Sequence, residues 1–148
     1  MGSIEMPSDG VGGATVLIAD DNPQILELLE AYLDPLELRV LIAMNGQEAL
    51  DTVENDQPDL ILLDIMMPKR SGFEVCRLLK DDPRYRDIPI IMVTALNEVA
   101  DMERARECGA DHFLSKPVNK LELLDRIQHL LELKNLKKAG GRKRTENR

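Results

Sequence analysis

Five polar residues directly follow or end short apolar runs of the sequence. They are, in chain order, Asp20 and Asp21 after TVLIA, Asp64 after LILL, Thr94 at the end of IIMVT, and Lys116 after DHFLS. Two adjacent acids at the end of an apolar run repel each other. Their presence needs a chemical explanation if all five residues meet in the folded chain.

The functional groups in this set suit phosphoryl chemistry. Carboxylates at close range raise each other's pKa, and a hard divalent cation such as Mg²⁺ removes that conflict because it prefers oxygen ligands. A lysine supplies a point charge for phosphate oxygens, a hydroxyl supplies a donor, and a carboxylate can act as a nucleophile. For Asp20 and Asp21 alone, capping of the following helix is an equally good interpretation. For the whole set, phosphoryl chemistry is favoured.

Alternating strand and helix patterns predict how these residues are positioned. We expect strands at 15–19, 38–44, 59–64, 88–95 and 111–115, and helices at 22–34, 46–56, 72–82, 97–110 and 119–139. Strict alternation predicts an α/β fold with a doubly wound, five-stranded parallel sheet, for which the flavodoxin-like order 2-1-3-4-5 is one arrangement. The polar residues would then meet at the carboxyl edge of the sheet, where ligands bind in such folds.

Details of the helices are also predicted. Asn22 should cap the first helix and Gly109 should end the fourth. The first helix should turn Leu28 inward with its other apolar residues, and the Gly-Gly pair at 140–141 should end the last.

Length and charge suggest one acidic domain with a basic C-terminal extension. The chain has 148 residues and a net charge of −8; residues 134–148 carry +6, which leaves −14 for residues 1–133. So acidic a body is a poor ligand for nucleic acid, because phosphate contacts require cations. We expect a flexible leader at 1–13, a folded domain at 14–134 and a flexible basic extension at 135–148. The extension could instead contact nucleic acid or a membrane.

Three further features concern the cell compartment. The sequence contains no run of about 18 apolar residues, so it predicts no membrane span. The first residues lack the basic start and apolar core of a signal peptide. Cys76 and Cys108 form no CxxC motif and are expected to be reduced thiols. We therefore expect a cytoplasmic protein.

Four stretches resemble the receiver domain of two-component response regulators, the CheY-like family. They are IADDNP, LILLDIMMPKRSGFEV, IPIIMVTA and GADHFLSKP. The resemblance extends from residue 15 to about residue 134. It implies a (βα)5 fold with strand order 2-1-3-4-5. It also implies a signalling switch that assists only its own phosphorylation and dephosphorylation, and is not otherwise an enzyme.

The resemblance also implies a role for each polar residue. Asp64 would accept a phosphoryl group from the phosphohistidine of a sensor histidine kinase or a histidine phosphotransfer protein. Mg²⁺ (or Mn²⁺) would be held by Asp20, Asp21, Asp64 and the backbone carbonyl of Met66. Thr94 and Lys116 would contact the phosphoryl oxygens.

Phosphorylation would act on an output surface formed by the elements at 97–110, 111–115 and 119–139. Thr94 and Phe113 are the implied switch residues, Lys116–Pro117 the implied cis peptide, and Ala95 the small residue over the acyl phosphate. Met66 and Leu96 occupy positions that help set how fast water removes the phosphoryl group. Because both are apolar, we expect a long-lived phosphorylated state.

Three other functions fit the sequence less well. An Asp-nucleophile phosphohydrolase would need an acid two residues after Asp64, where this chain has Met66. A nucleotide or flavin binder would need glycines in the turn DDNPQ. A DNA-binding regulator would need an output domain. The downstream partner is thus an unknown protein or an output domain outside this chain. The long last helix could form a homodimer contact or simply be unpartnered, and Arg70 is expected to be solvated.

Overall fold

The computed structural model describes residues 12–95, 103–104 and 106–146, with side chains to residue 135. Its elements are β1 (Thr15–Ala19), α1 (Pro23–Leu33), the 3-10 turn η2 (Asp34–Leu36), β2 (Arg39–Ala43), α2 (Gly46–Asp56), β3 (Leu60–Leu63), α3 (Gly72–Asp81), β4 (Ile90–Thr94), β5 (His112–Ser115) and α5 (Lys120–Glu146). Each observed strand lies within a predicted range. Half of the helix expected at 97–110, and all of the leader except its last two residues, lie outside the described residues.

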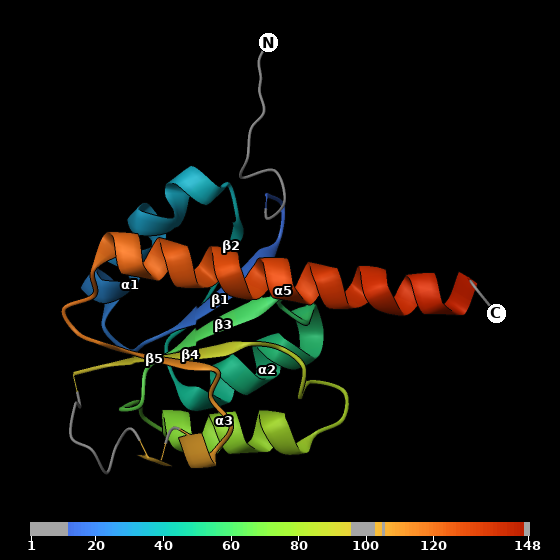
Figure 1. Ribbon diagram of the computed structural model, residues 1–148. Helices are drawn as coiled ribbons and strands as arrows, with labels where there is room; N and C mark the ends of the chain where they lie inside the picture. Colours follow the sequence, from blue (N-terminus) through green and yellow to red (C-terminus); the bar gives the residue numbers. More distant parts are fainter. Residues whose placement is uncertain (1–11, 96–102, 105, 147–148) are drawn as a thin grey trace.

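The five strands form one parallel sheet in the order β2-β1-β3-β4-β5, which confirms the predicted fold (Figure 1). The pairings keep the strands in register up to their carboxyl ends. Ala19 of β1 pairs with Ala43 on one side and Leu63 on the other, and Thr94 of β4 pairs with Ser115 of β5. The residues that follow these strands are therefore brought to one edge.

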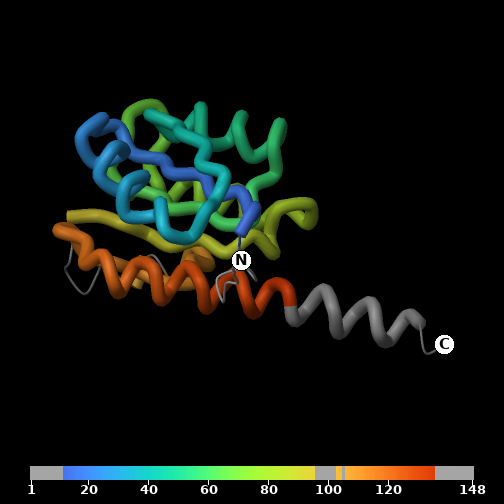
Figure 2. Tube along the Cα trace, turned by 90° about the horizontal axis from the view of Figure 1, so that it is seen from above, coloured from blue at the N-terminus to red at the C-terminus, as the bar shows by residue number. Residues whose placement is uncertain are grey.

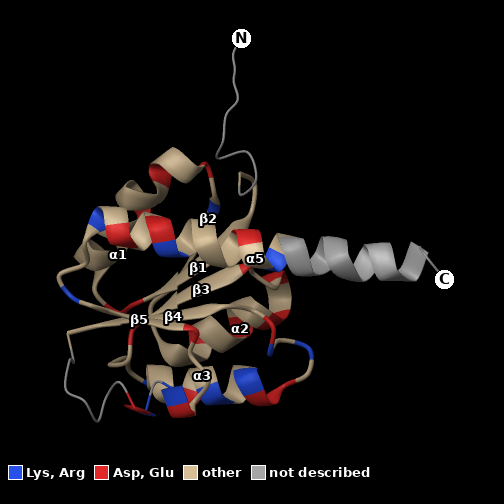
Figure 3. Cartoon of the chain, in the orientation of Figure 1, with Lys and Arg blue, Asp and Glu red and all other residues tan. Residues whose placement is uncertain are grey.

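Two apolar clusters cover the two faces of the sheet. Leu17 and Ile61 point toward α2 and α3, whereas their neighbours Val16 and Leu60 point toward α1 and α5. The views in Figures 1 and 2 show the described part of α5 lying along one side of the sheet. β1, β3 and β4 carry no charged residue (Figure 3), as expected for strands buried on both faces.

Side-chain caps begin each of the first three helices. Asn22 accepts a hydrogen bond from the Gln24 N–H (2.9 Å), with Pro23 at the first helical position. Asn45 and Ser71 cap α2 and α3 through the N–H groups of Glu48 and Glu74. A capping residue that is recognisable in the local sequence therefore sets where each of these three helices begins.

Three predictions concern helix ends and faces. Gly109, at φ +94°, follows the described helical residues before β5, which confirms the predicted end. The prediction for Leu28 was wrong: it is 43% exposed, and Leu26 packs inward instead. The Gly-Gly pair does not end α5, which continues to Glu146. Each glycine costs about 1 kcal/mol in a helix, which strong helix formers such as Leu, Lys and Ala around the pair can offset.

Two other predictions about the chain can be compared with the structure. Cys76 and Cys108 are buried and form no disulfide. Among the described residues, no helix is long and apolar enough to cross a membrane.

Candidate metal and phosphoacceptor site

Backbone hydrogen bonds at the strand ends fix the polar residues in place. The Asp20 N–H donates to Ala43 O (3.0 Å), and the Asp64 N–H donates to Ala19 O (2.9 Å). The Lys116 N–H donates to Thr94 O (2.8 Å). Each bond continues a strand pairing beyond the strand itself, so the sheet determines where these side chains begin.

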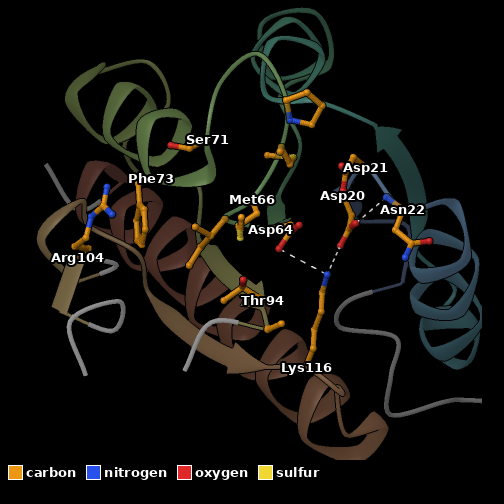
Figure 4. Close-up of a pocket in the computed structure, with 14 residues that line it drawn as sticks. Asp20, Asp21, Asn22, Asp64, Met66, Ser71, Phe73, Thr94, Arg104 and Lys116 are labelled. Carbon is orange, nitrogen blue, oxygen red and sulfur yellow. Dashed lines mark hydrogen bonds and ion pairs between the residues drawn. The ribbon is translucent and has the colours of Figure 1, made fainter. Parts of the chain in front are cut away.

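Three carboxylates meet at this edge (Figure 4). Oxygen atoms of Asp20, Asp21 and Asp64 lie within 4.8 Å of one another. Asp20 and Asp64 are 2% and 5% exposed, whereas Asp21 is exposed. Asp20 also accepts a hydrogen bond from the Asn22 N–H (2.9 Å), which holds one of its oxygens.

Lys116 provides a cation inside this cluster. Its Nζ lies 2.8 Å from Asp20 Oδ2 and 3.7 Å from Asp64 Oδ1, so the closer bond is to Asp20. One ammonium beside three ionised carboxylates leaves an excess of two negative charges. The Lys116–Pro117 peptide bond is cis.

Burial, and then the neighbouring charge, shift the pKa of Asp64. Burial raises the pKa of this carboxyl from 3.8 to about 6, and the charge of Asp20 adds to the effect. Lys116, the Ile65 N–H and Asp21 contribute less, the first two lowering the pKa and Asp21 raising it. A divalent cation among three carboxylate oxygens would balance this charge, so the residues present fit Mg²⁺.

The carboxylates lie in an open cleft of about 860 Å³. Thr94 and Ala95 line it, as does Met66, whose side chain projects with 64% of its surface exposed. All five polar residues predicted from the sequence thus reach the same cavity. Phe113 is placed differently: it is half-buried and packs against the apolar cluster on the α2 and α3 side.

One wall of the cleft was not foreseen from the sequence. Phe73 and Arg104 line it, and the Arg104 Cζ atom lies 4.1 Å from the centre of the Phe73 ring. This cation–π contact joins residues 31 positions apart, and no local pattern indicates it. Ser71 also lines this wall while it caps α3.

Comparison with known proteins decides the family. The model of the response regulator receiver domain matches residues 16–128. The chain belongs to this family. As a receiver domain it is the phosphoacceptor component of two-component signalling, a switch rather than a catalytic enzyme, and such a domain implies a histidine kinase as its partner.

Two curated relatives show how much of a longer protein such a domain represents. The receiver is 44% identical to response regulator PleD of Caulobacter vibrioides over 121 residues, which are 82% of this chain and 27% of PleD. It is 38% identical to the heme response regulator HssR of Staphylococcus saprophyticus over 122 residues, 82% of this chain and 53% of HssR. The chain thus spans about a quarter to a half of these relatives.

A solved structure with magnesium is also similar. The receiver domain of sensor histidine kinase PA1611 from Pseudomonas aeruginosa has a magnesium ion coordinated in its active site cleft. It is 30% identical to this receiver with a TM-score of 0.75, and the match covers 81% of this chain and 98% of that one.

Proposed function

We propose that Asp64 is the residue that receives the phosphoryl group. Its position carries the proposal: a nearly buried carboxylate at the end of β3, beside two further carboxylates and one lysine, opens into a cleft. A carboxylate oxygen would attack the phosphorus of a phosphohistidine on a sensor kinase or phosphotransfer protein. The P–N bond would break, and the imidazole would leave with its electron pair.

Asp20, Asp21, Asp64 and the backbone carbonyl of Met66 would hold Mg²⁺ or Mn²⁺. When bound, the metal neutralises negative charge on the carboxylates and the incoming phosphoryl group. The net charge of −2 around Lys116 supports a divalent ion at this place.

Lys116 and Thr94 would bind the phosphoryl oxygens. The Lys116 ammonium already lies between Asp20 and Asp64, so a small movement would bring it to a group on Asp64. Thr94 ends the strand next to β5, where it also pairs in the sheet with Ser115. Its hydroxyl would follow the phosphoryl group and transmit the change along this edge.

The signal would leave through β5 and α5, together with the helix expected at 97–110. Phe113 lies in β5 opposite Met92 of β4, two pairs before Thr94 and Ser115. Phosphorylation would shift the population between two arrangements of this face, with Thr94 and Phe113 as the switch residues. A downstream protein, an output domain or a second copy of the chain would recognise the favoured arrangement.

Intact mass spectrometry tests the site directly. The protein is incubated with Mg²⁺ and a small acyl phosphate, beside Asp64→Asn and Asp59→Asn variants. We expect one phosphoryl adduct in the wild type and in Asp59→Asn, which lies at the opposite edge of the sheet, and none in Asp64→Asn. An adduct that persists in Asp64→Asn would reject Asp64 as the acceptor.

The lifetime of the phosphorylated state gives a second prediction. Met66 is exposed at the cleft and cannot orient an attacking water molecule. Met66→Asn should therefore speed loss of the phosphoryl group by about threefold to tenfold, since it adds a group that can position water. Decay of the adduct is followed by mass, with Met44→Asn as the matched exposed methionine. Equal decay in Met66→Asn and wild type would contradict the prediction. Leu96, the second position of this hypothesis, lies outside the described residues.

A further inference from the structure

The loop between β3 and α3 leaves the phosphoacceptor and returns to it. The Gly72 N–H donates to Ile65 O (2.8 Å), which closes the base of the loop. A Cβ atom at Gly72 would lie 2.2 Å from the backbone oxygen of Asp64, so only glycine permits this approach. Met66, the proposed carbonyl ligand of the metal, lies within this loop and lines the cleft beside Asp64 (Figure 4).

The far end of the loop has a disfavoured backbone conformation. Lys69 has φ +72°, in the left-handed region that residues other than glycine rarely adopt. The Arg70 N–H donates to Pro68 O (2.8 Å) across it, which makes a tight three-residue turn. Turns of this kind with positive φ are rare and strained. They persist where the surrounding structure holds them.

Contacts with α2 provide that hold. The Gly46 N–H, at the start of α2, donates to Pro68 O (3.3 Å). A Cβ atom at Gly46 would come within 2.2 Å of the Arg70 backbone oxygen, so the loop lies directly against this helix end. The Arg70 side chain adds two further bonds, from Nε to Gln47 Oε1 (3.0 Å) and from Nη1 to Glu74 Oε2 (2.6 Å).

Arg70 therefore connects α2, the loop and the first turn of α3. Its guanidinium presents donors in a fixed planar fork, which suits two acceptors on different helices. The Glu74 contact is local, four residues along the chain, whereas the Gln47 contact spans 23 residues. Of these two side-chain bonds, the one to Gln47 fixes the loop relative to the rest of the domain.

We propose that Arg70, through its bond to Gln47, is a positioning residue for the metal site. It holds the loop from Met66 to Ser71 against α2, so that the Met66 carbonyl is already in place when a divalent cation binds to the aspartates. The inference rests on the proposed function, since it assumes that Mg²⁺ binds at these residues. Without the bond, the protein folds but must order this loop during binding, which weakens the affinity for Mg²⁺.

The test compares variants that remove or restore the bond. Arg70→Lys keeps a cation for Glu74 but lacks the separate Nε–H that donates to Gln47, and Gln47→Ala removes the acceptor. Gln47→Glu keeps an acceptor at the same place. Gln47 also donates to Asp51 (3.1 Å), so Asp51→Ala is the control for that second contact.

Two measurements are made on the whole chain. Hydrogen exchange of residues 64–72 without Mg²⁺ reports the order of the loop, and thermal unfolding at increasing Mg²⁺ gives the half-saturating concentration. Arg70→Lys and Gln47→Ala should raise that concentration by about tenfold, the low end of the effect of groups that orient a metal ligand. Both should speed exchange in the loop, whereas Gln47→Glu and Asp51→Ala should change neither quantity. Combining Arg70→Lys with Gln47→Ala should add little to either change, because both remove one bond.

The outcomes separate this inference from the proposed function. A wild-type protein without any Mg²⁺-dependent shift would overturn the proposed function and this inference with it. A normal shift in the wild type that is unchanged in Arg70→Lys and Gln47→Ala would overturn the inference alone. A merely structural role would lower the unfolding temperature of the variants and leave the half-saturating concentration unchanged, which would also overturn it.

Discussion

The two edges of the sheet each place a lysine beside an aspartate, with different results. At the amino edge, Asp59 accepts hydrogen bonds from the Thr15 N–H (2.8 Å) and from Lys134 Nζ (3.2 Å). At the carboxyl edge, Lys116 lies 2.8 Å from Asp20, with two more carboxylates close by. The residue types are the same at both edges, but the ratio of anionic to cationic side chains differs in the part of the chain that the structure describes.

This ratio separates a structural ion pair from a binding site. Among the described residues at the amino edge, the Asp59 carboxylate pairs with the Lys134 ammonium, and the pair ties α5 to the start of β1 and β3. At the carboxyl edge, the pKa of Asp64 is raised to about 6 because burial and neighbouring charge oppose its ionisation. An ion pair alone therefore says little about function, whereas a charge-unbalanced cluster with a buried carboxyl of raised pKa points to a functional site.

Replacing the lysine at each edge should give the largest difference in the free energy of unfolding between the two edges. Lys116→Met leaves Asp20, whose side chain is 3% exposed, without its cation and should lower the free energy of unfolding by about 2–4 kcal/mol. Lys134→Met breaks a more exposed pair and should cost about 0.5–1 kcal/mol. Urea unfolding in the presence of a chelator measures both. Equal losses would remove the distinction between the edges.

Neutralising an aspartate should have opposite signs at the two edges. Because the folded pKa of Asp64 lies above its unfolded value, ionisation of this carboxyl destabilises the fold as pH rises from about 4 through 6. Asp64→Asn should thus stabilise the metal-free protein by about 1–3 kcal/mol at about pH 7.5, and the gain should disappear near pH 4.

The matched change at the amino edge is Asp59→Asn. It weakens a satisfied pair and should destabilise by about 0.5–1 kcal/mol at the higher pH. The same urea titrations at the two pH values test both variants. A loss of stability in Asp64→Asn at the higher pH would show that burial and charge do not oppose its ionisation.

Magnesium should also distinguish the two edges, through a smaller change in the free energy of unfolding. At about ten times its dissociation constant, Mg²⁺ should stabilise the wild type by about 1.4 kcal/mol, and a chelator should reverse the gain. Asp59→Asn should keep the gain, whereas Asp64→Asn should lose most of it because a ligand is removed. Thermal unfolding with and without Mg²⁺ measures this. A gain that survives in Asp64→Asn would place the ion elsewhere.

The carboxyl edge was predictable from the sequence because its residues are marked locally. Asp20, Asp64 and Thr94 end or follow apolar runs, and strand order then brings them together. Helix caps such as Asn22 are also local signals. The family resemblance added roles that residue patterns alone did not supply.

Contacts across the chain were less predictable. Arg70 was expected to be solvated; its side chain is 38% exposed, and the structure also bonds it to Gln47, 23 residues away. The Arg104 contact with Phe73 was not anticipated either. No local sequence pattern specifies which side of a loop packs against which helix end, because that packing depends on the assembled sheet. The continuation of α5 past its glycines was missed because propensity is only a weak guide beside neighbouring helix formers.

The strand pairings that carry Asp20 and Asp64 have one more consequence. Since successive side chains of a strand point to opposite faces, a slip of one residue in β1 or β3 would exchange the side chains that pack on the α2 and α3 side with those that pack on the α1 and α5 side. The same slip would move a carboxylate away from its partners. A misaligned sheet would disturb the packing of both apolar clusters and separate the proposed phosphoryl acceptor from its partners, so acceptance of a phosphoryl group also reports that the strands have paired correctly.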